Sequence, residues 1–461
     1  MQISKEIAHD VIDMALAHGA DFCDLFLENT RSQNLRVKND VVESVNQGID
    51  FGIGIRLIYG TEVLYGYTNS IEREELLKVT KVLGQRYKSQ KCTDLRAFTP
   101  NLVNNIHPIN CGLNNGAMTE DKISYLKHIS SHGLKASGSI KISEASLTQR
   151  HQYVQIYNSN GLMAEDDRHY CRVMSNVIAE KNGEQSTGYF APGGLKGWEF
   201  CSSVNPEELA KKASDQAMIK LDASPCPGGK MPVIIGNGFG GVIFHEACGH
   251  LLETTSVQKK SSVFWDKMNE EIANSAVSAV DDGTIVNEWG SINIDDEGMR
   301  TKKTQLIKDG ILTNFLCDYV GSLKTQYEPT GSGRRQSYKF APASRMRNTY
   351  IEAGKHTLEE MISTVDHGIF CKSMGGGSVS PGTGEFNFAA LESYLIENGK
   401  ITKPLKSATL IGTGPETLKK ISMVGNDLEF SAGMCGSVSG AVPVTVGQPA
   451  LKVDEILVGG Q

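Results

Sequence analysis

The spacing of apolar residues divides the first half of the chain into two blocks of similar order. The first block is predicted as a helix, four strands and a helix, at residues 4–17, 24–28, 42–45, 51–59, 63–67 and 71–87. After a polar, Asn-rich connector at 101–117, a second block is predicted as a helix, three strands and a helix, at 119–131, 139–147, 153–157, 173–180 and 205–221. The repeated order predicts an N-terminal α/β domain over residues 1–224, with two similar sub-blocks at 1–100 and 118–224.

The pattern changes after a Pro- and Gly-rich boundary at residues 221–229. Residues 233–244 form an apolar stretch that predicts a strand leading into a helix, and residues 253–283 are polar with helical stretches. From residue 284 onward the chain consists of short strand-like runs and Gly-rich turns, with helix predicted only at 356–365 and 415–420. The second half is therefore predicted as a β-rich domain over residues 225–461, and the whole chain as an α+β fold.

Charge and composition limit the classes of partner. The formal net charge is −7 and no dense Lys/Arg cluster interrupts it, which argues against direct nucleic-acid binding. The first residues are charged where a signal peptide would be apolar, and no apolar run approaches the roughly 18 residues that span a membrane. We therefore predict a cytoplasmic protein without a membrane segment. The ten cysteines occur singly and suggest neither a disulfide framework nor a zinc ribbon.

The strongest candidate chemistry lies in His245-Glu246-Ala247-Cys248-Gly249-His250. Imidazoles are good zinc ligands, and a neighbouring carboxylate can take a proton from a metal-activated water. However, histidines at i and i+5 point about 140° apart on a regular helix. The segment is therefore either a buried helix with hydrogen-bonded core histidines, or a metal-binding helix that a π-bulge widens locally, with Gly249 easing the distortion.

A metal site also needs a third ligand from this chain. Glu253 is three residues beyond His250, and His-His-Glu sites are common among zinc peptidases. Cys248 lies between the histidines but would face elsewhere if they converge. Cys435 lies among glycines, in Gly433-Met434-Cys435-Gly436, where a flexible main chain would let a thiolate reach inward.

Several stretches together resemble the TldD/PmbA family, and its TldD branch in particular. The motif at residues 245–250 resembles the family's HExxxH signature, and the similarity extends over nearly the whole chain. The other similar stretches are Gly52-Ile53-Gly54-Ile55-Arg56, Asp295-Asp296-Glu297-Gly298, Thr330-Gly331-Ser332-Gly333-Arg334-Arg335, Arg345-Met346-Arg347-Asn348-Thr349, Gly433-Met434-Cys435-Gly436 and Val458-Gly459-Gly460.

The resemblance implies a zinc metallopeptidase that cuts unfolded or small peptides. It implies that His245, His250 and Cys435 hold Zn²⁺ and that Glu246 is the general base. It also implies a homodimer, or a heterodimer with a PmbA-like subunit. One departure follows the cysteine, where the family usually has Lys, Gly and Gln and this chain has Ser437-Val438-Ser439-Gly440.

Two alternatives to a peptidase stay open. One is a non-catalytic scaffold or partner subunit of such an enzyme, and the other is a protein-binding regulator of a DNA enzyme such as gyrase. Two further clusters have open roles. Asp295-Asp296-Glu297 is most simply a solvated turn, whereas Arg334 and Arg335 could hold a peptide carboxylate or form structural ion pairs.

Overall fold

The computed structural model describes residues 2–87, 94–101, 103–109, 112–113, 117–380, 382–406 and 408–460, and its α+β fold agrees with the prediction. Part of the predicted connector at 101–117 lies outside the described residues. The α-helices are α1 (Lys5–Ala17), α2 (Arg73–Gly84), α3 (Thr119–Lys135), α4 (Trp198–Ser203), α5 (Pro206–Leu221), α6 (Val242–Ala247), α7 (Thr254–Val257), α8 (Tyr319–Thr325), α9 (Leu358–Ser363) and α10 (Gly414–Lys420). Two 3₁₀ helices, η1 (Gly238–Gly241) and η2 (Gly249–Leu252), flank α6.

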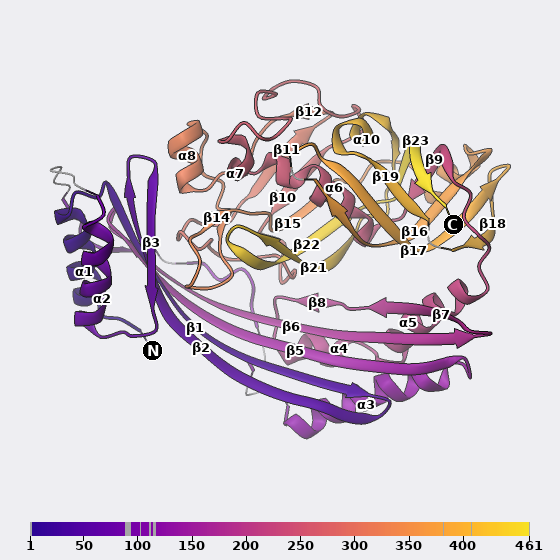
Figure 1. The fold of residues 1–461 in the computed structure, drawn as a ribbon, viewed down its shortest axis with the longest axis horizontal. Helices are drawn as coiled ribbons and strands as arrows, with labels where there is room; N and C mark the ends of the chain where they lie inside the picture. The colour runs from indigo at the N-terminus through magenta and orange to yellow at the C-terminus, as the bar shows by residue number, and fades with distance from the viewer. Residues whose placement is uncertain are drawn as a thin grey trace.

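One long sheet combines the two N-terminal blocks. Its strands are β1 (Phe22–Lys38), β2 (Val41–Tyr59), β3 (Glu62–Thr68), β4 (Thr99–Pro100), β5 (Ile140–Asn158), β6 (Leu162–Lys181), β7 (Glu184–Phe190) and β8 (Gly193–Gly194). The main path is β3-β2-β1-β5-β6-β4, and β7 and β8 also pair with β6. In Figure 1 the long strands sweep beneath the C-terminal half, with α1 and α2 at one end and α3, α4 and α5 at the other.

The long strands of this sheet were only partly predicted. β2 is one strand of 19 residues, whereas two shorter strands were predicted at 42–45 and 51–59. Gln47 and Gly48 instead pair with Gln33 and Ser32 of β1 in continuous antiparallel register. Polar residues inside these strands are stabilised by tertiary contacts, as where buried Lys122 of α3 donates a hydrogen bond to Gln33 at 2.8 Å. Hydrophobic alternation cannot detect strand residues of this kind.

The C-terminal half contains two large sheets and a short hairpin. One sheet has the order β12-β11-β10-β15-β22-β21. Its strands are β10 (Ala279–Asp282), β11 (Lys303–Lys308), β12 (Ile311–Leu312), β15 (Asn348–Ile351), β21 (Glu429–Ser437) and β22 (Gly440–Gln448). The hairpin consists of β13 (Gly333–Arg334) and β14 (Ala343–Ser344).

The other large sheet has the order β16-β9-β23-β19-β17-β18, and β17 also pairs with β16, so five of its strands form a closed ring. Its strands are β9 (Gly229–Ile235), β16 (His367–Val379), β17 (Glu385–Glu397), β18 (Lys400–Leu405), β19 (Thr409–Thr413), β20 (Ile421–Val424) and β23 (Leu451–Gly459). The short helix α6 contacts β16 and β17 of this sheet and β15 and β22 of the other. The predicted metal motif therefore lies within the largest apolar core of the molecule.

The acidic triplet Asp295-Asp296-Glu297 joins the two halves, and the prediction of a solvated turn was wrong. Asp295 and Asp296 are almost fully buried. Asp296 accepts hydrogen bonds from Arg168 of β6 at 2.6 Å and from the Arg335 main chain at 2.7 Å. Glu297 pairs with buried Arg56 of β2 at 2.8 Å. Guanidinium and main-chain N–H groups thus replace water around these acids, which makes their burial tolerable.

Two further observations concern the cysteines and the helices. Cys171 of β6 and Cys201 of α4 form a disulfide that their isolated positions in the sequence did not suggest. In the described part of the chain, no helix has the length and apolar character that crossing a bilayer requires.

Arg168→Ala should destabilise the junction between the halves. The guanidinium bonds Asp166, Asp296 and the Ile294 carbonyl, so its removal leaves two buried carboxylates without their cation. We expect a loss of about 3–5 kcal/mol in unfolding free energy, measured by denaturant or thermal unfolding.

Arg73→Ala is the matched control, because Arg73 forms an exposed ion pair with Asp10, a type of pair worth at most about 1 kcal/mol. Equal, small losses of unfolding free energy in the two variants would contradict a stabilising role for Arg168 at the junction.

Candidate metal centre

Gly241 sets the path of the chain into the site. β9 ends at Ile235, and η1 then carries the chain into α6 across the main chain of β22. A Cβ on Gly241 would lie 2.7 Å from the Gly447 carbonyl oxygen. Only glycine therefore allows the helix to start this close to the strand. The predicted order of strand followed by helix is confirmed here.

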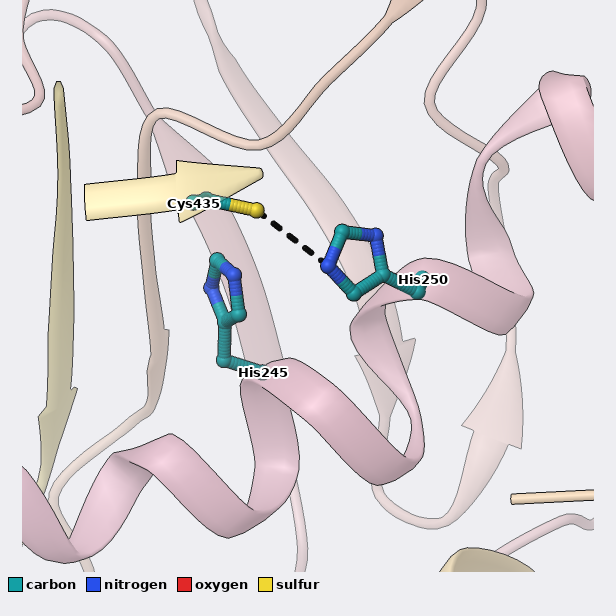
Figure 2. Close-up of side chains that lie close together, drawn as sticks. All are labelled: His245, His250 and Cys435. Carbon is teal, nitrogen blue, oxygen red and sulfur yellow. Dashed lines mark hydrogen bonds between the residues drawn. The ribbon is translucent and has the colours of Figure 1, made fainter. Parts of the chain in front are cut away.

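The helix breaks between the two histidines, and no π-bulge forms. α6 ends at Ala247, Cys248 leaves the helical region at φ −130°, and η2 continues from Gly249. His245 is the fourth residue of α6, whereas His250 is the second residue of η2. The change of axis brings both rings to one side of the segment, as Figure 2 shows. Their centroids are 5.2 Å apart and their planes are nearly perpendicular, at 83°.

Cys435 completes the cluster from β21, in the sheet that also contains β15 and β22. Its Sγ lies 3.2 Å from Nε2 of His250 (Figure 2), and the three potential ligand atoms of His245, His250 and Cys435 lie within 4.8 Å of one another. Burial alone would raise the pKa of the thiol, but the two imidazoles outweigh it and lower the pKa to about 3. The site therefore favours the thiolate, which is the form that binds metals.

His245 provides the test of whether these residues fit a metal. It is 1% exposed, and neither ring nitrogen forms a hydrogen bond of normal geometry with any described residue. Buried polar atoms are nearly always satisfied, so an imidazole with no partner next to a thiolate and a second imidazole is unusual. Zinc bonds of about 2.0–2.3 Å in a tetrahedron place ligands about 3.3–3.8 Å apart, which is compatible with this spacing. The donor set fits zinc.

Glu253 occupies a supporting position rather than a place among the three converging atoms. Its Oε2 lies 2.9 Å from Nδ1 of His250, on the far side of the ring from Cys435. Burial would lower the pKa of His250, but Glu253 and Cys435 outweigh it, and the pKa is raised well above its usual value. A carboxylate on the second nitrogen is the usual way of orienting a metal-binding histidine. Cys248 is buried with its Sγ against Gly414, and burial raises the pKa of its thiol.

Glu246 lies at the accessible side of the cluster. Its side chain is 29% exposed, and its Oε2 is 3.8 Å from Nε2 of His250. Solvent can therefore still reach the Glu246 carboxylate, which lies beside the converging nitrogen and sulfur atoms.

Arg345 and Met346 connect the histidine segment to the cysteine strand. Buried Arg345 donates hydrogen bonds to the main-chain carbonyls of Cys435 and Gly440 and to Oγ of Ser439. Next to it, the Met346 sulfur lies so close to Gly249 that a Cβ there would come within 2.2 Å of it. No role could be assigned to these two residues from the sequence, because their contacts join segments far apart in the chain. Ser439 belongs to the stretch that departs from the family pattern, and here it anchors the β21–β22 turn.

Arg334 and Arg335 are structural in this fold. Both are buried, Arg334 donates to the Met346 carbonyl at 2.7 Å, and Arg335 donates to the Asp296 carbonyl at 2.9 Å. Of the two interpretations open from the sequence, the geometry favours the structural one.

Sequence comparison identifies the family to which this fold and cluster belong. Three sequence models of the family match, described as PmbA/TldA metallopeptidase domain 1, central domain and C-terminal domain, over residues 23–83, 117–221 and 228–460. The chain belongs to the PmbA/TldD family.

Individual relatives agree with this assignment. A metalloprotease TldD homolog of Haemophilus influenzae is 36% identical, and the match covers 99% of this chain and 97% of the relative. A zinc metalloprotease TldD homolog of Saccharolobus solfataricus is 27% identical over 96% of this chain and 97% of its own.

Solved structures show the same fold at low sequence identity. TldE from Thermococcus kodakarensis superposes with a TM-score of 0.77 at 17% identity, covering 98% of this chain and 100% of TldE. A Thermotoga maritima protein described as a candidate modulator of DNA gyrase gives a TM-score of 0.79 at 20% identity, covering 99% and 100%.

Cys435→Ala should abolish tight zinc binding and leave the fold intact. The cysteine is one of three converging donors, while the main chain of β21 is held by pairing with β22 and by Arg345. Zinc content after dialysis, measured by mass spectrometry, checks the loss.

Cys248→Ala is the control, since it removes another buried thiol from the same site region without removing a converging donor. Unchanged zinc affinity in Cys435→Ala would refute the ligand set and favour Glu253 as the third ligand.

Proposed function

We propose that this chain is a zinc-dependent peptidase that hydrolyses unfolded or small peptides. The observation that carries the proposal is the convergence of His245, His250 and Cys435 around the unpartnered nitrogens of His245, with Glu246 at the accessible side. Family membership and the metalloprotease names of the relatives support a peptidase, and the word zinc in one of those names supports the metal.

His245, His250 and Cys435 would hold the zinc. When bound, zinc supplies a Lewis acid that polarises a peptide carbonyl and lowers the pKa of a water molecule. Three protein ligands leave a tetrahedral site one position short, as catalytic zinc sites require. Glu253 keeps the His250 ring oriented, and Arg345 keeps Cys435 at the distance where it faces both rings.

Glu246 would move the proton. Its carboxylate lies close to the ligand atoms but is not among the three that converge, and it retains contact with solvent. It can therefore accept the proton of the attacking water and pass it to the amine of the departing peptide fragment.

The scaffold alternative from the sequence is less well supported. A subunit without catalytic function has no need to keep a thiolate, two converging imidazoles and a solvent-accessible carboxylate in one place. A gyrase regulator gains no specific support from the site, and the fold it shares with the Thermotoga maritima protein does not transfer that description.

We also propose a cytoplasmic dimer, either of two copies of this chain or with a PmbA-like subunit. Residues 41–50 of β2 form a sheet edge that pairs only with β1 among the described strands, and Val41, Val45 and Ile49 on it are exposed. Free edges with apolar residues invite pairing with another chain.

Native mass spectrometry with and without a coexpressed PmbA-like chain separates the two dimers, and Ile49→Lys should weaken the dimer that forms. A monomer under both conditions would contradict the proposal.

Glu246→Gln separates metal binding from catalysis. The amide keeps the size of the side chain but cannot accept a proton, so we expect near-normal zinc content. Cleavage of an unfolded peptide should fall by about a hundredfold or more, the range that general acid–base catalysis supplies. Zinc analysis and a peptide-cleavage assay on the same preparation measure both effects.

His245→Ala is the companion variant, because it should lose zinc and activity together. If Glu246→Gln lost its zinc, Glu246 would be a ligand. If Glu246→Gln kept both zinc and full activity, the general base would lie elsewhere.

A further inference from the structure

A second cluster of potential ligands lies in the N-terminal sheet, far in sequence from the first. His151 comes from β5, and Asp167 and His169 come from β6. His151 and His169 stand directly opposite each other in the antiparallel register, and Asp167 is two residues before His169. Because alternate residues of a strand share a face, all three side chains project from the same side of the sheet.

That side is the outer face of the sheet, opposite the C-terminal half. The residues next to the ligands along the strands, Arg150 and Arg168, project the other way. Arg150 donates to the carbonyl of Gln336, and Arg168 donates to the carboxylate of Asp296. The cluster is therefore separated from the centre at Cys435 by the thickness of the sheet and by the junction between the halves.

The three side chains already converge on one point. Nε2 of His151 contacts Oδ1 of Asp167, and Nε2 of His169 lies 3.4 Å from Oδ2 of the same carboxylate. The two imidazole rings are stacked, with centroids 4.0 Å apart and planes 17° from parallel, so that both Nε2 atoms point the same way. The three potential ligand atoms lie within 4.8 Å of one another.

Burial distinguishes this group from a chance surface cluster. The His169 side chain is 6% exposed, His151 is 30% exposed and Asp167 is 55% exposed. The His169 ring is thus fixed by packing, while the Asp167 carboxylate leaves a path to solvent.

We propose that His151, Asp167 and His169 form a second metal site, which binds a divalent first-row transition ion such as zinc. Two imidazoles and one carboxylate are a recurrent ligand set for such ions and leave coordination positions to water. Without a thiolate and with more solvent exposure, this site should bind zinc more weakly than the centre at Cys435. A bound ion would link His151 of β5 to the two residues of β6 that flank Arg168. Arg168 is the residue that joins the sheet to Asp296.

Zinc titration of the intact protein, followed by native mass spectrometry, tests the proposal. The wild-type chain should take up two zinc ions, the second at higher free zinc. Asp167→Asn and His151→Gln should each weaken only the second equivalent, by about a hundredfold or more, since even residues that merely support ligands cost about 10–100-fold in metal affinity. Asp167 is largely exposed, so the Asn variant should still fold without zinc, which circular dichroism checks.

His132→Gln is the matched control. His132 lies on α3 beside Glu207, with its Nε2 3.1 Å from Oε1, but these two residues belong to neither three-residue ligand cluster. It should leave both zinc equivalents unchanged. Cys435→Ala should remove the first equivalent and keep the second, so this site and the proposed catalytic site can fail separately. A wild-type chain that binds one zinc, or second-site binding that survives Asp167→Asn and His151→Gln, would overturn the proposal.

Discussion

The contact between Arg345-Met346 and the two metal-motif segments is the constraint on which the candidate centre depends. His250 and Cys435 are 185 residues apart in sequence, yet Sγ and Nε2 lie 3.2 Å apart. Arg345 donates to the Cys435 carbonyl of β21, to the Gly440 carbonyl of β22 and to Oγ of Ser439 in the turn between them. Met346 fills the space that a side chain at position 249 would need. A buried guanidinium and a glycine thus set the distance between the Cys435 sulfur and the imidazoles.

The same principle, buried cations paired with polar main chain and carboxylates, holds the two halves of the molecule together. Arg56 and Arg168 reach from the long sheet to Glu297 and Asp296, and Arg347 pairs with Asp281 inside the C-terminal half at 2.6 Å. Such pairs are costly to bury and costly to break singly. They therefore favour one relative placement of the sheet and the metal-bearing domain, because any other placement would leave charges without partners.

Local sequence patterns predicted much of the fold, but they could not predict features that depend on contacts between distant segments. The α+β class and the entry from strand to helix followed from hydrophobic spacing, and the family followed from motifs such as that at residues 245–250. The break at Cys248 could not be foreseen, because Gly249 is required by Met346, a residue distant in sequence. The continuous β2 and the burial of Asp295 and Asp296 were missed for the same reason: their polar side chains are satisfied by distant segments. The second cluster was also missed, because His151, Asp167 and His169 lie outside the predicted strands and come together only through the pairing of β5 with β6.

Anomalous X-ray diffraction at the zinc absorption edge, on crystals of the zinc-loaded protein, would locate the ion and its ligands directly. We expect the strongest zinc peak between His245, His250 and Cys435, with Sγ about 2.3 Å from the ion and an imidazole nitrogen of each histidine at about 2.0–2.1 Å. Glu253 should remain on Nδ1 of His250 and Glu246 should stay outside the bonded atoms. A protein that retains zinc but shows no peak at these three residues, or shows an ion bound by Glu253 without Cys435, would contradict the account.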